Sequence, residues 1–263
     1  MRERRIRPSG RTYLLLTMII LLIFFAGCVS SSEIQSDTTD RSNSSITVTD
    51  SYDNTVTFPH TVSRIICLPG TAAETLVSIG AGDKIVGVSE YTTRDVYLMN
   101  HMPNATSVGD WWLPDVEKII ALHPDLVISY GISQSKAGNI DKLLAANITV
   151  IYVKCYDIRD LANETRMLGR ITGEETRSEK VASFSERYMT LIQERLANIN
   201  QDESTKLRVY FERWTDYSTL ARDSPQQDIL TILHAKNVAA DIPLVQAEVS
   251  PEWIIDQNPD VIF

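Results

Sequence analysis

The sequence predicts an α/β protein with two doubly wound, Rossmann-like lobes bridged by one long α-helix. Short apolar runs rich in β-branched residues alternate with helical segments between residues 64 and 168. A long segment free of glycine and proline follows, and after it two stretches of the first half recur in the same order. Because alternating strands and helices are typical of a parallel sheet with both faces covered, each half is expected to form such a sheet.

The first residues are typical of an export signal. Residues 1–28 open with five arginines and one glutamate and continue with an apolar run at 14–25. That run is shorter than the roughly 20 residues that span a bilayer, so a cleaved signal peptide is favoured over a permanent membrane anchor. Phe25-Ala26-Gly27-Cys28 resembles a bacterial lipobox, which implies a lipid on Cys28. Under either alternative the rest of the chain is held at the outer face of the cytoplasmic membrane.

A polar tether is predicted at residues 29–45, which are mostly Ser, Thr, Asp and Asn and contain too few apolar residues to fold. Loss of residues 1–27 removes five arginines and one glutamate, so the net charge changes from −9 to −13. An acidic body argues against a nucleic-acid partner. It is compatible with docking onto a basic surface of a membrane protein.

The first lobe is predicted at residues 46–171. Alternating apolar and polar residues around Tyr52-Asp53-Asn54 predict a hairpin at 46–50 and 55–58. Strands are expected at residues 64–68, 84–88, 126–129 and 149–153. Helices are expected at residues 71–79, 115–122, 133–146 and 158–168. Right-handed crossovers then place the loops that follow the strands on one rim.

The bridging helix is predicted at residues 172–199, where Val181, Phe184 and Tyr188 begin an apolar stripe at helical spacing. A partial second lobe, residues 200–263, opens with a strand. In it, residues 227–235 repeat 73–81, and 251–262 repeat 116–128. Counterparts of the later helix and strand of the first lobe do not follow, so we expect an incomplete second lobe, with either weak ligand binding or folding of the first lobe only.

Several of these segments together resemble a known family. They are Arg64-Ile65-Ile66-Cys67-Leu68, the helix with Glu74, Lys84-Ile85-Val86-Gly87-Val88 and the segment from Glu117 to Ile128. This combination resembles the helical-backbone substrate-binding proteins of ABC importers for ferric siderophores, haem and vitamin B12, from Ile46 to the last residue. The resemblance implies capture of an iron chelate or corrinoid between the lobes, delivery to a permease and its ATPase, and no intrinsic cofactor.

Two carboxylates are candidates for docking. Thr71-Ala72-Ala73-Glu74 has the spacing of a capping box, so a structural role would also explain Glu74. The resemblance implies that a carboxylate on each lobe meets arginines of the permease, and Glu74 and Asp228 fall at those two positions.

Aromatic and arginine side chains on the rim loops are candidate ligand contacts. Flat rings offer contact area at low entropic cost, and arginine supplies a fixed charge for anionic oxygens. About half of these aromatics are instead expected to pack under their loops. The first lobe supplies Tyr91, Arg94, Trp111, Trp112 and Tyr130, and the second supplies Arg213, Trp214, Tyr217 and Arg222.

No metal motif is present among the cysteines and histidines. Cys67 and Cys155 could pair in an oxidising compartment, but two buried thiols are the favoured interpretation. The four histidines are scattered, so direct capture of a naked transition metal is not expected. His123 and His234 are predicted at helix ends, where the helix dipole favours a cation.

Two other classes of function compete with transport. A hydrolase would need a nucleophile elbow, but Gly131-Ile132-Ser133-Gln134-Ser135 lacks the second glycine and no histidine is placed to serve it. A surface lipoprotein for sensing or adhesion could keep the fold without a permease. The sequence therefore predicts a binding protein and not an enzyme, with sensing or adhesion as the alternative to transport.

Overall fold

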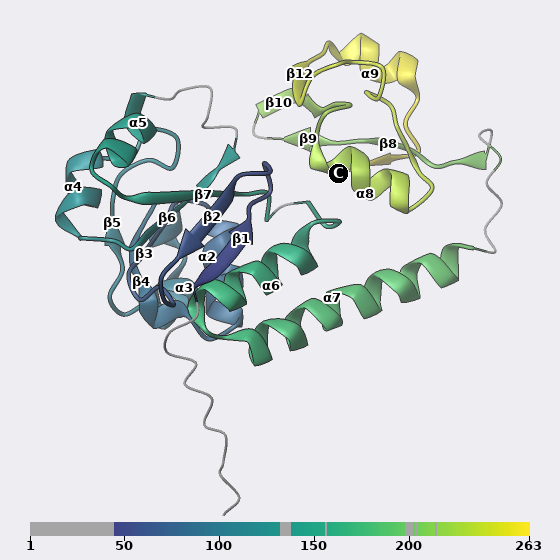
Figure 1. Cartoon of the computed structure of the whole chain (residues 1–263). Coiled ribbons are helices and arrows are strands. Elements are labelled where there is room, and N and C mark those ends of the chain that lie inside the picture. The colour runs from purple at the N-terminus through teal and green to yellow at the C-terminus, as the bar shows by residue number, and fades with distance from the viewer. Residues whose placement is uncertain (1–44, 132–137, 156, 198–201, 203–204, 214) are drawn as a thin grey trace, which may run out of the picture. The chain divides into compact units, whose positions relative to one another are not determined.

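A computed structural model describes residues 45–263 except 132–137, 156, 198–201, 203–204 and 214 (Figure 1). The predicted export signal, the lipobox with Cys28 and nearly all of the tether lie outside the described residues. Within the described residues, none of the helices is long and apolar enough to cross a membrane.

The first parallel sheet has the strand order β5-β4-β3-β6-β7. Its strands are β3 (Ile65–Cys67), β4 (Ile85–Val88), β5 (Thr106–Ser107), β6 (Leu126–Tyr130) and β7 (Thr149–Val153). Every residue of β3 and β4 is buried, because helices cover a parallel sheet on both faces. The doubly wound architecture predicted from the alternation of strands and helices is therefore confirmed.

Five helices pack on this sheet. They are α2 (Gly70–Ser78), α3 (Val96–His101), α4 (Val116–Ala121), α5 (Gly138–Ala145) and α6 (Leu161–Thr172). Side chains that alternate along β3 point to opposite faces of the sheet, so Ile65 belongs to one core cluster and Ile66 to the other. The first cluster includes residues of α2, α3 and α6, and the second includes residues of α4 and α5 (Figure 1).

The predicted hairpin is confirmed as β1 (Ile46–Thr49) paired antiparallel with β2 (Thr55–Phe58). Its turn is organised by Asp50, a buried carboxylate that accepts backbone N–H groups from Tyr52 at 2.9 Å and Asn54 at 3.0 Å. The backbone N–H of Tyr152, on β7, also donates to Asp50, at 3.0 Å. One carboxylate therefore shapes the turn and attaches it to the sheet.

The long helix is α7 (Glu175–Leu196), and it begins just after α6 ends at Gly173. Gly173 has φ 77°, a left-handed conformation that glycine adopts without strain, so the chain can reverse between the two helices. Arg166 on α6 then joins them, because its guanidinium donates to Glu179 at 2.8 Å and to Glu186 at 2.6 Å on α7.

The second parallel sheet repeats part of the first. Its strands are β8 (Arg208–Tyr210), β11 (Lys236–Asn237) and β13 (Val261–Ile262), in the order β11-β8-β13. Its helices are α8 (Pro225–Ile232) and α9 (Pro251–Gln257). By the internal repeat, β8, β11 and β13 correspond to β3, β4 and β6, which also lie in the order β4-β3-β6.

The repeat extends to backbone conformation. His123 follows α4 with φ 47°, and its counterpart Asn258 follows α9 with φ 45°. Gly80 follows α2 with φ 86°, and its counterpart His234 follows α8 with φ 55°. Both histidines therefore lie at helix ends, as predicted. Each ends its helix through a left-handed conformation that non-glycine residues seldom adopt.

A three-stranded sheet in the second lobe was not predicted. It is antiparallel, with the order β12-β10-β9, and its strands are β9 (Glu212–Arg213), β10 (Thr215–Leu220) and β12 (Gln246–Glu248). The first three residues of β10 are exposed and the last three are buried, so β10 has no simple alternation of polar and apolar residues. The first lobe also contains two short 3₁₀ helices, η2 (Gly82–Lys84) and η3 (Thr92–Arg94).

Candidate functional site

The candidate ligand contacts of the first lobe lie on loops at the carboxyl ends of its parallel strands. Strand β4 leads into the loop with Tyr91, and β5 leads into the loop with Trp111. The two loops run side by side, because the backbone N–H of Glu90 donates to the carbonyl of Gly109 at 2.7 Å. Strand β6 ends at Tyr130, which opens the neighbouring loop.

Three of the predicted residues form an aromatic cluster, namely Trp111, Trp112 and Tyr130. The Trp111 ring meets Tyr130 edge to face, with centroids 5.4 Å apart and planes at 83°. Trp111 and Trp112 meet in the same manner, at 5.1 Å and 74°. Edge-to-face contacts are a favourable geometry for aromatic rings, because the positive edge of one meets the negative face of another. The three rings are half-buried.

Packing and hydrogen bonding hold this aromatic cluster in place. Trp111 packs against the second core cluster, and the Tyr130 hydroxyl lies 3.5 Å from the Thr71 hydroxyl on α2. Burial raises the pKa of Tyr130, so its phenol stays neutral and can donate a hydrogen bond. The aromatic cluster thus presents a preformed and uncharged surface at the rim.

Tyr91 and Arg94 lie on the adjoining loop and are more exposed. Tyr91 is 62 % exposed, and the Arg94 guanidinium lies 3.8 Å from the carboxylate of Glu90. An ion pair between exposed side chains contributes little to stability, so Arg94 can leave Glu90 for another anion at small cost.

The candidates of the second lobe lie on or next to the antiparallel sheet. Arg213 is on β9, Tyr217 is on β10, and Arg222 follows β10 beside Asp223 at 3.3 Å. Tyr217 has φ 65° at a shift of register in β10, and its ring is 45 % exposed. A bulge of this kind interrupts the regular hydrogen bonds between the strands and changes the direction in which a side chain points. Trp214 lies outside the described residues.

The capping-box interpretation of Glu74 is wrong. Helix α2 begins at Gly70, with Pro69 at its N-cap position and no side-chain cap. The carbonyl of Pro69 accepts the N–H of Ala73 at 3.1 Å, so the backbone of Thr71 is already helical and cannot be the N-cap. Glu74 is exposed on the first half of α2.

Asp228 lies on α8 and is engaged by a residue from a distant part of the chain. Its Oδ2 accepts a hydrogen bond from Nη2 of Arg159 at 2.6 Å. Arg159 precedes α6 and also donates to Asp157. Sequence reasoning missed Arg159, because no spacing or motif relates it to Asp228.

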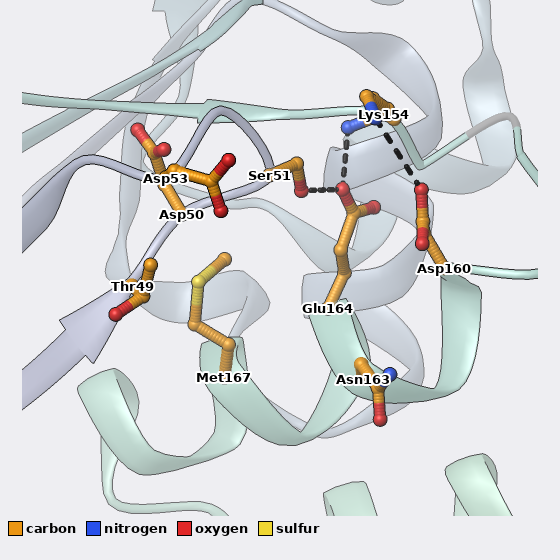
Figure 2. A pocket seen from close by; sticks show the side chains of 9 residues that line it. All are labelled: Thr49, Asp50, Ser51, Asp53, Lys154, Asp160, Asn163, Glu164 and Met167. Atoms are coloured by element: carbon orange, nitrogen blue, oxygen red, sulfur yellow. Dashed lines mark hydrogen bonds and ion pairs between the residues drawn. The ribbon is translucent and has the colours of Figure 1, made fainter.

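The structure also contains a polar pocket of about 360 Å³ that sequence reasoning did not predict (Figure 2). The hairpin turn, the end of β7 and the first turns of α6 form its walls. It is lined by Thr49, Asp50, Ser51, Asp53, Lys154, Asp160, Asn163, Glu164 and Met167. None of the predicted ligand contacts lines it.

Glu164 is the central side chain of the pocket wall. It is 4 % exposed, and its Oε1 accepts the backbone N–H of Lys154 at 2.5 Å and the hydroxyl of Ser51 (Figure 2). The Lys154 ammonium lies 3.6 Å from Asp160. These contacts fasten the hairpin turn to the end of β7 and to α6. A structural role is therefore sufficient to explain the polar side chains of this pocket wall.

Cys67 and Cys155 are both free and buried, which agrees with the interpretation as two buried thiols. Burial raises the pKa of both thiols, and the Glu164 carboxylate raises that of Cys155 further. A thiol that resists ionisation is a poor nucleophile and a poor metal ligand. Among the described residues, no group of three or more His, Cys, Asp or Glu side chains is placed to hold a metal ion. Most of the weak nucleophile-elbow segment after Gly131 lies outside the described residues.

Comparison with known proteins decides the family. Residues 65–263 match the family model of periplasmic binding proteins, which is well over half of the chain. The chain belongs to the periplasmic binding protein family. The family resemblance stated from the sequence is confirmed. The relatives also favour a solute-binding protein of an ABC importer over the alternative, a protein for sensing or adhesion. The family consists of binding proteins and not of enzymes.

Relatives of this periplasmic binding protein cover most of its length. It is 28% identical over 250 residues to the uncharacterized ABC transporter substrate-binding lipoprotein YvrC of Bacillus subtilis, covering 93% of this chain and 77% of YvrC. It is 25% identical over 206 residues to the vitamin B12-binding protein of Vibrio parahaemolyticus, covering 77% of this chain and 70% of that protein.

A solved structure supports the same fold. The molybdate periplasmic binding protein MolA of Haemophilus influenzae matches with a TM-score of 0.71 at 21% identity, covering 82% of this chain and 73% of that one. This likeness concerns the fold alone.

Proposed function

We propose that this periplasmic binding protein captures a bulky metal chelate, either a corrinoid or an iron chelate, and delivers it to the permease of an ABC importer. The aromatic cluster is the observation that carries the choice of ligand. Three half-buried rings at the carboxyl ends of the strands offer a large aromatic surface, which suits a macrocycle or a catecholate better than a small hydrophilic solute. The vitamin B12-binding relative supports a ligand of this size.

Arginines complete the proposed site. Arg94 in the first lobe, and Arg213 and Arg222 in the second, would supply fixed positive charge for carboxylate, phosphate or catecholate oxygens. The exposed rings of Tyr91 and Tyr217 would add contact area, since both already lie on the surface. Trp214 is proposed with them on the strength of its place in the sequence, next to Arg213.

Delivery is proposed to depend on Glu74 and Asp228. A carboxylate on each lobe can form a charge-assisted, bidentate pair of hydrogen bonds with a permease arginine. Binding through both carboxylates requires the two permease arginines to be spaced as the carboxylates are. Glu74 is exposed and is not needed as a helix cap, which supports a role outside the protein itself.

A lipid on Cys28 is proposed to keep the protein beside its permease. YvrC is described as a lipoprotein, and the lipobox of this chain occupies the position expected for one. Residues 29–45, as a flexible coil, would reach on the order of 20 Å, which is enough for the folded part to move over a membrane partner.

Tryptophan fluorescence tests the ligand proposal. The purified protein is titrated with cyanocobalamin, haemin and a ferric siderophore, and one of the three is expected to quench the emission saturably. Trp111→Phe and Trp112→Phe should weaken that ligand's affinity. The matched control is Trp253→Phe on α9, which should retain wild-type affinity. Absence of a saturable response to all three compounds would refute the proposed ligand class.

Charge reversal tests docking separately from ligand binding. Glu74→Lys should abolish uptake of the ligand into cells and leave its affinity for the purified protein unchanged. Glu117→Lys, an exposed glutamate on α4, is the matched control and should support normal uptake. A loss of ligand affinity in Glu74→Lys would place Glu74 in the ligand site instead.

A further inference from the structure

We infer that Arg159 takes the place on Asp228 that a permease arginine would take in the proposed docking. Docking therefore requires Arg159 to be displaced from Asp228. The inference rests on the proposed function and deepens it. It is carried by a contact between two segments 69 residues apart in sequence, in which Nη2 of Arg159 donates to Oδ2 of Asp228 at 2.6 Å.

Arg159 is presented to Asp228 by a second carboxylate. Asp157 accepts Nε of Arg159 at 3.1 Å through Oδ1 and Nη2 at 2.9 Å through Oδ2. The backbone N–H of Arg159 also donates to Asp157 Oδ1, at 3.0 Å. Nη2 carries two hydrogens, so it can serve Asp157 and Asp228 together. The fork of Asp157 therefore fixes the plane of the guanidinium and leaves the second hydrogen of Nη2 for Asp228.

The loop that carries this pair is itself ordered by hydrogen bonds. The backbone N–H of Asp157 donates to the carbonyl of Lys154 at 2.6 Å, and the N–H groups of Asp160 and Leu161 both donate to the carbonyl of Asp157 at 3.1 Å. Lys154, at the end of β7, donates its backbone N–H in turn to Glu164 on α6. These hydrogen bonds connect residues 157–161 with the end of β7 and so position Arg159 in the first lobe.

The electrostatics of the Asp157–Arg159 pair agree with this geometry. The hydrogen bond from Arg159 holds the pKa of Asp157 below its usual value, and Asp157 raises the pKa of Arg159. The Asp157 side chain is 13 % exposed, whereas that of Arg159 is 58 % exposed. The Asp157 side chain is therefore largely covered by protein. The Arg159 side chain is exposed, so an incoming group can compete with it for Asp228.

Competition follows from the bonding that docking needs. An arginine from the permease binds a carboxylate best through two parallel N–H···O bonds, which use both carboxylate oxygens. Arg159 already takes an acceptor site of Oδ2 and places a positive charge beside Asp228, so an incoming arginine must compete with it. The Asp228 side chain is 32 % exposed, which leaves room for an exchange.

The two docking carboxylates would then act in sequence. Glu74 is exposed and forms no ion pair with the other described residues, so it can meet a permease arginine at once. Asp228 becomes available only when Arg159 moves aside. Engagement of the second lobe by the permease would therefore be coupled to the loss of a contact between residues 159 and 228.

Binding to permease-containing membrane vesicles tests the inference on the full-length protein. Arg159→Gln removes the competing charge and should bind these vesicles roughly 1.5- to 5-fold more tightly than wild type, the range that an exposed ion pair accounts for. Arg187→Gln, an exposed arginine on α7, is the control and should not change binding. In an Asp228→Asn background, Arg159→Gln should have no effect.

The outcomes separate this inference from the proposed function. If wild type binds the vesicles and Arg159→Gln binds equally or more weakly, the inference is overturned and docking stands. If wild type does not bind them better than vesicles without permease, the docking proposal fails and the inference fails with it.

Discussion

Arg208 donates its backbone N–H to the carboxylate of Asp260 at 2.8 Å, which ties the start of β8 to the start of β13. The guanidinium of Arg208 also reaches the carbonyl of Gln257, at the end of α9. Arg64 and Asp125 make the same connection in the first lobe at 3.0 Å, and Arg64 reaches the carbonyl of Leu122 at 2.6 Å. The two lobes therefore share a clamp in which one arginine satisfies the last carbonyls of a helix and one aspartate orders the next strand.

Removal of the first clamp should destabilise the first lobe. The Asp125 carboxylate accepts the backbone N–H groups of Ser63 and Arg64 and the Ser63 hydroxyl. Asp125→Ala leaves these donors without their acceptor and is expected to lower the free energy of unfolding by about 1–3 kcal/mol. Urea denaturation followed by circular dichroism measures it. Asp241→Ala, an exposed aspartate, is the control, and an equal loss in both variants would contradict the clamp.

Glu164→Ala should be more damaging than its neighbour Asn163→Ala. Glu164 is buried and holds Ser51 and the N–H of Lys154, whereas Asn163 is exposed in the same turn of α6. Loss of a buried charged acceptor is expected to cost about 2–4 kcal/mol. Chemical denaturation gives the stability, and hydrogen exchange in residues 46–58 reports whether the hairpin loosens. A change within about 0.5 kcal/mol of that in Asn163→Ala would rule out the fastening role.

The ion pairs between α6 and α7 predict a dependence of stability on pH. Hydrogen bonding from Arg166 lowers the pKa of Glu179 from 4.5 to about 2, and it also lowers the pKa of Glu186. Because the folded pKa is below the unfolded value, the contribution is complete above about pH 4.5 and is lost as the pH falls towards 2. Both glutamates are exposed, so the effect is expected to be small.

Arg166→Gln provides the measurement for this pair of helices. The difference in free energy of unfolding between wild type and Arg166→Gln should be largest near pH 6 and should shrink below pH 4.5. Arg187→Gln on the same helix as the two glutamates should show no such trend. A difference that stays constant between pH 6 and pH 2.5 would mean that Arg166 acts through packing and not through its charge.

Cys28→Ala should release the protein from the membrane if the anchor is a lipid. The expected result is loss of labelled fatty acid from the protein and a shift from the detergent phase to the aqueous phase in Triton X-114 partitioning. Cys67→Ala leaves the lipobox intact and should keep both properties. Retention of Cys28→Ala in the membrane would favour the alternative, an uncleaved helix at residues 14–25.

Strands β3, β4, β6 and β7 could be predicted because each is a largely buried apolar run bounded by turns. Runs of this type are visible in a sequence, as at residues 64–68 and 149–153, and a repeat in the second half adds a second copy of the same signal. The short parallel strands β5 and β11 consist of polar residues and were not predicted. The antiparallel sheet around β10 could not be predicted, since its exposed and buried residues do not alternate. The aromatic cluster was foreseeable as a set of loop aromatics but not as a set of rings in contact.

By itself, the sequence predicted the export signal, the two-lobed repeat and the candidate carboxylates, because these predictions depend on composition, periodicity and correspondence along the chain. Only the tertiary structure decided which side chains meet. Glu164 is an ordinary glutamate in the sequence, and its burial follows from three separate segments closing around it. Arg159 meets Asp228 for the same reason, since pairing between residues far apart in the chain depends on how the segments pack and not on any local pattern.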